Sequence, residues 1–120
     1  MNPQPEAAIE AVRDYIAHLD AWQLAAFDTA TATTKSCVIA LALAEGHMTA
    51  LEATAAARLE EDFQTELYGF VEGGHDWDVA STKIRLLSAE IIFRSLEMDK
   101  EEPAAFSCLM EALEAGGKVQ

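Results

Sequence analysis

The stretch at positions 21–44, AWQLAAFDTATATTKSCVIALALA, decides the fold class of this chain. Read at helical spacing, it carries two apolar or small stripes: Phe27, Thr31, Thr34, Val38 and Leu41, and Ala30, Thr33, Cys37, Ala40 and Ala44. A surface helix has one apolar stripe, so two stripes predict a central, buried helix. Its threonine hydroxyls can bond to carbonyls of the preceding turn and need not form a polar site. Gly46 is the expected end of this helix.

The residues before this stretch predict a separate amino-terminal helix. Pro5 can occupy its first turn. Spacings of three and four then place four apolar side chains on one face: Ile9, Val12, Ile16 and Leu19. Asp20, with Gln23 three residues later, is a candidate N-cap for the next helix. We therefore expect a bend at Asp20 and not one continuous rod.

The residues that follow predict a third helix of similar length. Thr49 and Glu52 have the spacing of a capping box. One apolar line follows, made of Leu51, Ala55, Leu59, Phe63, Leu67 and Phe70. Three glycines mark the expected end of this helix: Gly69, Gly73 and Gly74. The acidic residues of this segment lie beside or opposite that line.

A fourth helix is expected after these glycines, with Asp76 or Asp78 as its cap. It has two adjoining apolar stripes, Ile84, Leu87 and Ile91, and Leu86, Ala89, Phe93 and Leu96, so it too is expected to be heavily buried. A polar linker over 97–102 precedes a short helix that Pro103 opens. The sequence thus predicts an all-α fold: one helical domain over residues 1–120, a bundle of about four main helices plus a short C-terminal helix.

The charge balance excludes several classes of partner. The chain has 21 acidic and 8 basic residues, a net charge of −13. Nucleic acids and anionic membrane surfaces need Lys and Arg, so both are poor partners. The longest apolar run, Cys37 to Ala44, is too short to span a bilayer, so stable membrane insertion is not expected. The acidic surface serves either solubility or the recognition of a basic client.

The sequence offers no spacing that is specific for catalysis or cofactor binding. His18, His47 and His75 form neither His-x-x-x-His nor Glu-x-x-His pairs. Glu72, His75 and Asp76 could ligate a metal, but a turn before a capped helix explains them as well. Cys37 and Cys108 are expected to be reduced core residues. We therefore expect no enzyme, and no catalytic, cofactor-binding or metal-binding residue.

Four short motifs, in order and at characteristic spacing, resemble one protein family. They are Leu19-Asp20-Ala21-Trp22-Gln23-Leu24, Ala57-Arg58-Leu59-Glu60-Glu61-Asp62-Phe63-Gln64, Tyr68-Gly69 and His75-Asp76-Trp77-Asp78, followed by the apolar helix Ile84 to Leu96. Together they are similar to the ATP synthase assembly chaperone that binds the alpha subunit of the catalytic head. That family occurs in mitochondria and in some bacteria. The resemblance covers roughly Ile9 to Leu96.

The resemblance implies a chaperone that holds the unassembled alpha subunit of F-type ATP synthase until the beta subunit arrives. Such a chaperone requires no ATP and no metal. The chain corresponds to the family's helical C-terminal part, and nothing in it matches the strand-rich N-terminal domain. A bacterial cytoplasm is the expected location, whereas eukaryotic members of the family are in the mitochondrial matrix.

The same resemblance, together with the acidic cluster and the tryptophan, gives five candidate partner-binding residues: Glu60, Glu61, Asp62, Asp76 and Trp77. Glu60 matches the first Glu of the family's signature, a position associated with its chaperone activity. Glu60 either contacts a basic residue of the client or forms an intramolecular pair with Arg58, Lys83 or Arg85. For Trp77, core packing at the helix start is the alternative to partner contact.

Two rival functions stay open at this point. One is a small helical ligand-binding module or enzyme, with a pocket between the second and fourth predicted helices. The other is an acidic adaptor or a helical dimer that uses an exposed apolar stripe.

Overall fold

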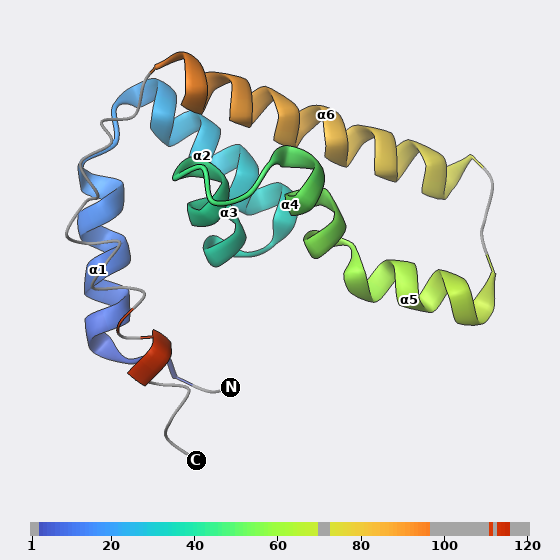
Figure 1. Cartoon of the computed structure of the whole chain (residues 1–120), viewed down its shortest axis with the longest axis horizontal. Helices are drawn as coiled ribbons and strands as arrows, with labels where there is room; N and C mark the ends of the chain where they lie inside the picture. Colours follow the sequence, from blue (N-terminus) through green and yellow to red (C-terminus); the bar gives the residue numbers. More distant parts are fainter. Residues whose placement is uncertain (1–2, 70–72, 97–110, 112, 116–120) are drawn as a thin grey trace. The chain divides into compact units, whose positions relative to one another are not determined.

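The computed structural model describes residues 3–69, 73–96, 111 and 113–115, and within them every regular element is a helix (Figure 1). The predicted all-α fold is confirmed. The elements are α1 Glu6–Ala17, α2 Ala21–Thr34, α3 Cys37–Ala44, α4 Ala50–Ala57, α5 Leu59–Tyr68 and α6 Gly74–Ser95. The backbone contacts fall into two compact units, one of Met1–Asp20 with Asp99–Gln120 and one of Ala21–Met98.

In the first unit, α1 begins directly after Pro5, which is its N-cap and not a residue of its first turn. The buried side of this helix is made of Ala8, Ala11 and Tyr15. The predicted face of Ile9, Val12, Ile16 and Leu19 is only half-buried. The predicted apolar face therefore lies next to the buried face and is displaced from it by one residue along the sequence. Alanines form most of the buried face, and their small side chains give a weak hydropathy signal. α1 ends at Ala17 and α2 begins at Ala21, so the two segments are not one continuous helix.

In the second unit, the stretch 21–44 is two helices, and the prediction of one continuous helix was wrong. Lys35 adopts a left-handed backbone conformation with φ of 55° and ends α2. The Thr34 hydroxyl donates to the Ala30 carbonyl at 2.8 Å, and the Ser36 hydroxyl accepts from the Ile39 backbone N–H at 3.2 Å. A side-chain bond at the end of one helix and an N-cap at the start of the next stabilise this break.

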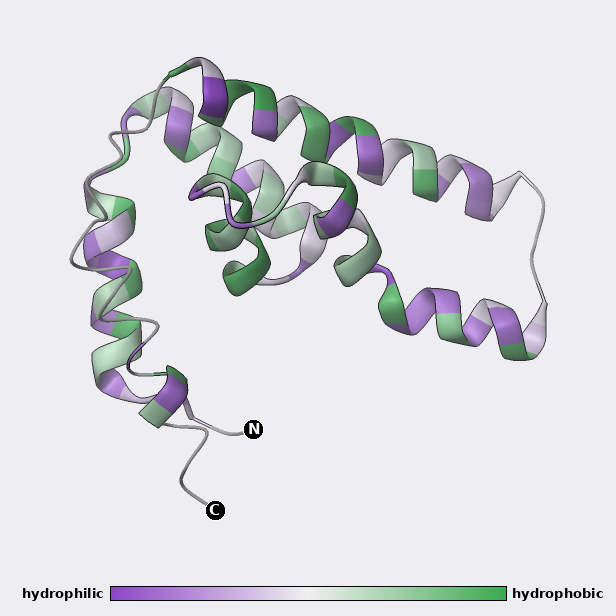
Figure 2. Cartoon of the chain, viewed as in Figure 1, coloured by the Kyte–Doolittle hydropathy of each residue, from purple (hydrophilic) through white to green (hydrophobic). Residues whose placement is uncertain are grey.

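The core of this unit lies where α2, α3, α4 and α6 meet. α6 packs along α2 and α4, while α3 packs against α2 and α4. The predicted burial of α3 is confirmed, and Figure 2 shows its ribbon as almost uniformly hydrophobic. Only one of the two stripes predicted for α6 is buried, through Leu86, Ala89 and Phe93. Val38 is exposed, against expectation, and Cys37 is half-buried, where burial raises the pKa of its thiol.

The segment 49–70 begins as predicted and then departs from the expectation. Thr49 and Glu52 form the predicted capping box at the start of α4. The helix then breaks at Arg58, and α5 contains no buried residue. The apolar line from Leu51 to Leu67 is therefore exposed over most of its length. Phe70, the last member of that line, lies outside the described residues.

The start of α6 also differs from the prediction. Gly73, with φ of 87°, is the N-cap of this helix, so neither Asp76 nor Asp78 caps it. Asp76 lies in the first turn instead, where a carboxylate interacts favourably with the helix dipole. The predicted C-terminal helix opened by Pro103 falls largely outside the described residues, although 111 and 113–115 are helical. Among the described helices, none is both long and apolar enough to cross a bilayer.

Candidate functional site

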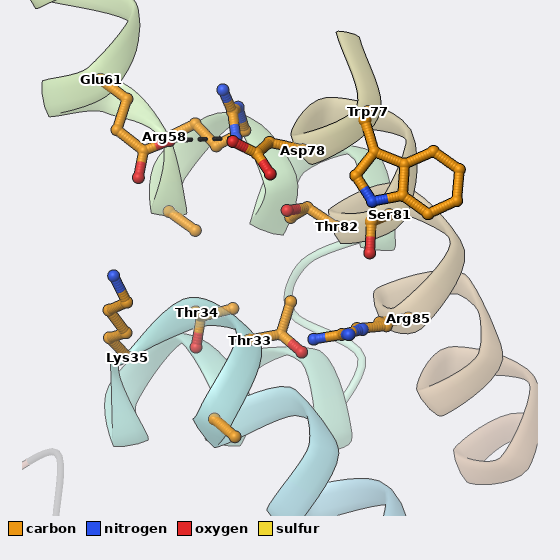
Figure 3. A pocket seen from close by; sticks show the side chains of 12 residues that line it. Thr33, Thr34, Lys35, Arg58, Glu61, Trp77, Asp78, Ser81, Thr82 and Arg85 are labelled. Atoms are coloured by element: carbon orange, nitrogen blue, oxygen red, sulfur yellow. Dashed lines mark ion pairs between the residues drawn. The ribbon is translucent and has the colours of Figure 1, made fainter. Parts of the chain in front are cut away.

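The second unit has a hollow of about 400 Å³ between the end of α2, the junction of α4 and α5, and the first half of α6 (Figure 3). We call it the polar hollow, and its lining consists of Ala32, Thr33, Thr34, Lys35, Ala57, Arg58, Glu61, Trp77, Asp78, Ser81, Thr82 and Arg85. A second hollow of about 390 Å³ continues along α5 and shares Arg58, Glu61 and Asp78 with it. The two hollows therefore adjoin each other beside α5.

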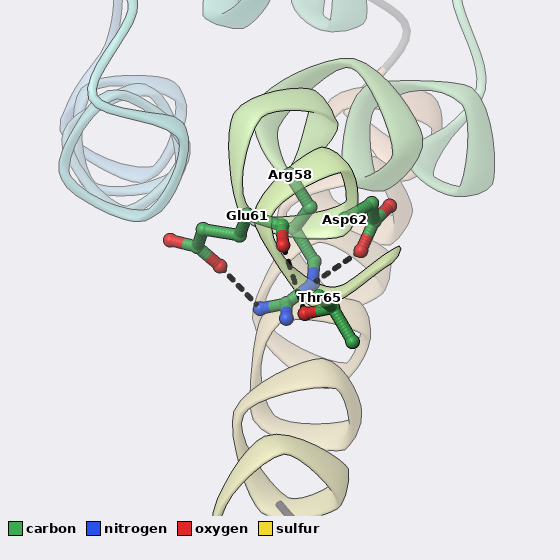
Figure 4. Close-up of polar contacts among 4 residues, drawn as sticks. All are labelled: Arg58, Glu61, Asp62 and Thr65. Carbon is green, nitrogen blue, oxygen red and sulfur yellow. Dashed lines mark hydrogen bonds and ion pairs between the residues drawn. The ribbon is translucent and has the colours of Figure 1, made fainter. Parts of the chain in front are cut away.

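Arg58 lies at the junction between α4 and α5 and lines both hollows. Its Nη1 is 3.0 Å from Glu61 Oε2, and its Nε is 3.9 Å from Asp62 Oδ1 (Figure 4). The residue is only 9% exposed, and its buried Nε has no hydrogen-bond partner among the described residues. A buried guanidinium needs compensating charge, which the two carboxylates supply. Arg58 thus orients the start of α5.

The five candidate partner-binding residues separate into three groups. Glu61 and Trp77 both line the polar hollow, and Asp62 lies beside it through its pair with Arg58. Asp76 is exposed in the first turn of α6 and is absent from the lining. Glu60 is also absent from the lining and accepts a 3.4 Å hydrogen bond from Gln64 Nε2.

The structure bears directly on the two alternatives for Glu60. Arg58 pairs with Glu61 and Asp62, and none of Arg58, Lys83 or Arg85 forms an ion pair with Glu60 in the part of the chain that the structure describes. The intramolecular ion pair considered for Glu60 is therefore absent there. Trp77 is 73% exposed, so core packing does not account for it.

An exposed apolar surface runs along α5 next to these acids. Leu59, Phe63 and Leu67, which we call the apolar ridge, are 72%, 61% and 60% exposed. At 100° per residue, Glu60 flanks one side of the ridge and Glu66 the other. Ile84 and Ile91 are exposed in the same way on α6. Exposed apolar side chains rimmed by charge are typical of protein-binding surfaces.

Sequence reasoning missed the residues that make the hollow polar. Lys35, Arg85, Thr33, Ser81 and Thr82 line it, and none of them was a candidate. They come from two helices far apart in sequence and form no local motif. The expectation of a pocket between the second and fourth predicted helices was the one signal that pointed to this place.

Metal ligation finds no support in the described residues. Among them, no group of three or more His, Cys, Asp or Glu side chains could hold a metal ion. Glu72, one member of the combination considered with His75 and Asp76, lies outside those residues.

Comparison with known proteins finds a similarity to a curated protein. The chain is 31% identical over 96 residues to the protein atp12, mitochondrial, of Schizosaccharomyces pombe, a match that covers 80% of this chain and 33% of that protein. No protein-family model matches the chain, and no solved structure matches it. The chain thus spans about a third of the length of this curated relative, and the similarity extends over four-fifths of the chain's own length.

Proposed function

We propose that this chain acts in the assembly of F-type ATP synthase, as a chaperone that binds the unassembled alpha subunit of the catalytic head. The observation that carries the proposal is the similarity to atp12 over 96 residues, a span that can hold all four motifs. The client surface of a free subunit is apolar, because it is normally covered by the neighbouring subunit, and it aggregates when uncovered.

The surface of α5 supports this role physically. Leu59, Phe63 and Leu67 offer apolar area to a client, and no buried residue ties α5 into the core. Glu60 beside them forms no ion pair with a described residue, so it can meet a client cation without first breaking an internal pair. Apolar contact flanked by carboxylates suits binding that is specific but reversible.

A matched pair of variants tests the proposal. Glu60→Gln removes one carboxylate from α5, and Glu10→Gln removes one from an exposed position on α1. We expect wild type and Glu10→Gln to bind purified alpha subunit and suppress its aggregation in light scattering, and Glu60→Gln to do both less well. The melting temperatures of all three should agree within about 1 °C, since exposed carboxylates contribute little stability. Absence of alpha-subunit binding and of aggregation suppression by the wild-type chain would overturn the proposal.

A second candidate, a small ligand-binding module, is favoured by one observation. The polar hollow lies between α2 and α6, where such a pocket was expected, and its volume of about 400 Å³ is in the range of small-molecule sites. Native mass spectrometry of the purified chain would reveal a retained ligand. A stoichiometric ligand of defined mass would favour this candidate over the chaperone.

A further inference from the structure

The polar hollow gathers positive charge in a strongly acidic protein. The chain has 8 Lys and Arg residues in total, and Lys35, Arg58 and Arg85 all line this one depression. Glu61 and Asp62 neutralise Arg58. Lys35 and Arg85 form no ion pair within the described part of the chain, so their charges are available. The lining also holds two acidic side chains, Glu61 and Asp78, and Figure 3 shows Asp78 on the Arg58 side of the opening.

The two available cations, one in the turn after α2 and one on α6, border the same space. Figure 3 shows Arg85 extending from α6 toward Thr33 of α2, with Lys35 at the end of α2 on the other side of the opening. Thr33 already donates its hydroxyl proton to the Thr29 carbonyl at 2.7 Å, whereas Ser81 and Thr82 add hydroxyl donors from α6. A guanidinium, an ammonium and hydroxyl groups around one opening are the donors that a carboxylate accepts from.

We propose that the polar hollow binds an acidic side chain, Asp or Glu, of the client protein. This inference rests on the proposed function and assigns a second contact to it, separate from Glu60 and the apolar ridge. A protein segment fits better than a free metabolite, because the lining is mostly polar and gives a small molecule little apolar surface to bury. Trp77, exposed at the edge of the hollow, offers apolar area to the residues beside the acidic one.

The main experiment compares two doubly substituted chains of equal charge. Lys35→Gln with Arg85→Gln removes both available cations from the hollow. Arg13→Gln with Lys83→Gln removes two exposed cations that are not in its lining. We expect the first pair to weaken binding of the purified alpha subunit about tenfold or more, the scale of charge-assisted hydrogen bonds, and the control pair to weaken it less than about threefold. Both should melt within about 2 °C of wild type, because exposed cations without partners add little stability.

A direct probe separates this inference from the proposed function. An acetylated tetrapeptide of glutamate, titrated into the wild-type chain, should shift the backbone amide NMR signals of residues 33–35 and 81–85, and the matching glutamine peptide should not. If alpha subunit binds wild type and the hollow variant equally, the acidic subsite is wrong while the chaperone proposal stands. If alpha subunit does not bind at all, the chaperone proposal fails, and the peptide titration alone decides whether the hollow takes carboxylates. Saturation of the same signals by inorganic phosphate, without any effect of the glutamate peptide, would assign the hollow to a free anion and overturn the inference.

Discussion

Arg94 joins the end of α6 to the end of α3, and its removal gives the most quantitative prediction. Its Nη2 donates to the Leu43 carbonyl at 2.7 Å and its Nη1 to the Ala44 carbonyl at 3.5 Å. These carbonyls belong to the last turn of α3, where backbone acceptors lack helical partners and where a cation also interacts favourably with the helix dipole. The guanidinium of Arg94 on α6 thus caps the C-terminal end of α3 and fixes the two helices to each other.

The expected cost follows from these contacts. A hydrogen bond to a charged group contributes about 1.5–3 kcal/mol when shielded, and solvent around the exposed Arg94 reduces this to about 1–2 kcal/mol. With an unfolding entropy of about 2.1 cal/mol/K per residue, the 120-residue chain should lose about 4 °C in Tm per kcal/mol. Arg94→Met, which keeps the apolar stem, should therefore lower Tm by about 4–8 °C. Arg94→Lys, which keeps the charge but not the paired donors, should lower it by less.

Gly46 supplies a second variant for a double-mutant cycle. It has φ of 78°, and a Cβ placed on it would lie 3.2 Å from Arg94 Nη1. Gly46→Ala should cost about 1–2 kcal/mol from the left-handed conformation, plus the crowding of the guanidinium. The crowding disappears when Arg94 is Met, so the two substitutions together should cost less than the sum of their separate effects. Calorimetric melting of the four proteins measures this coupling. A Tm change below about 1 °C for Arg94→Met, or strict additivity with Gly46→Ala, would refute the interpretation.

Three further predictions concern burial and backbone strain. Leu86→Ala should destabilise the chain by about 2–5 kcal/mol in urea unfolding, whereas Ile84→Ala should cost less than about 0.5 kcal/mol, because Leu86 is 0% and Ile84 64% exposed; equal costs would contradict the assigned faces of α6. Lys35→Gly should stabilise the chain by about 1 kcal/mol, because glycine adopts the φ of 55° without strain, and a destabilisation would argue against that turn. Burial raises the pKa of Cys37, so the folded state favours the protonated thiol over the thiolate. The contribution of Cys37 to the stability of the folded chain is therefore intact below the ordinary pKa of 9.0 and is lost as the pH rises beyond it. In a Cys108→Ser background, Cys37 should therefore react with a thiol reagent more slowly in the folded than in the urea-unfolded chain at pH 8, and equal rates would rule this out.

The candidate site was only partly predictable. The acidic signature and Trp77 were visible as patterns, because consecutive charges and a tryptophan between aspartates stand out in a sequence, whereas the exposure of Trp77 came only from the structure. The polar hollow was not visible as a pattern, since Lys35 and Arg85 approach the same space only after α2 and α6 have packed together. The sequence also left open whether the apolar ridge is buried or exposed. An apolar line at helical spacing says that its members share a face, but it does not say what that face meets.

The sequence by itself determined that this chain is helical, that one helix begins at the Thr49 capping box, and that the helical structure is interrupted before Ala21. Those features depend on contacts within a few residues, which the order of side chains specifies directly. Only the tertiary structure decided that Lys35 and Arg58 interrupt predicted helices, that Leu86 and not Ile84 enters the core, and that α5 keeps its apolar ridge exposed. Each of these outcomes depends on which surfaces of distant segments fit together, and burial is a property of that packing and not of the helix alone.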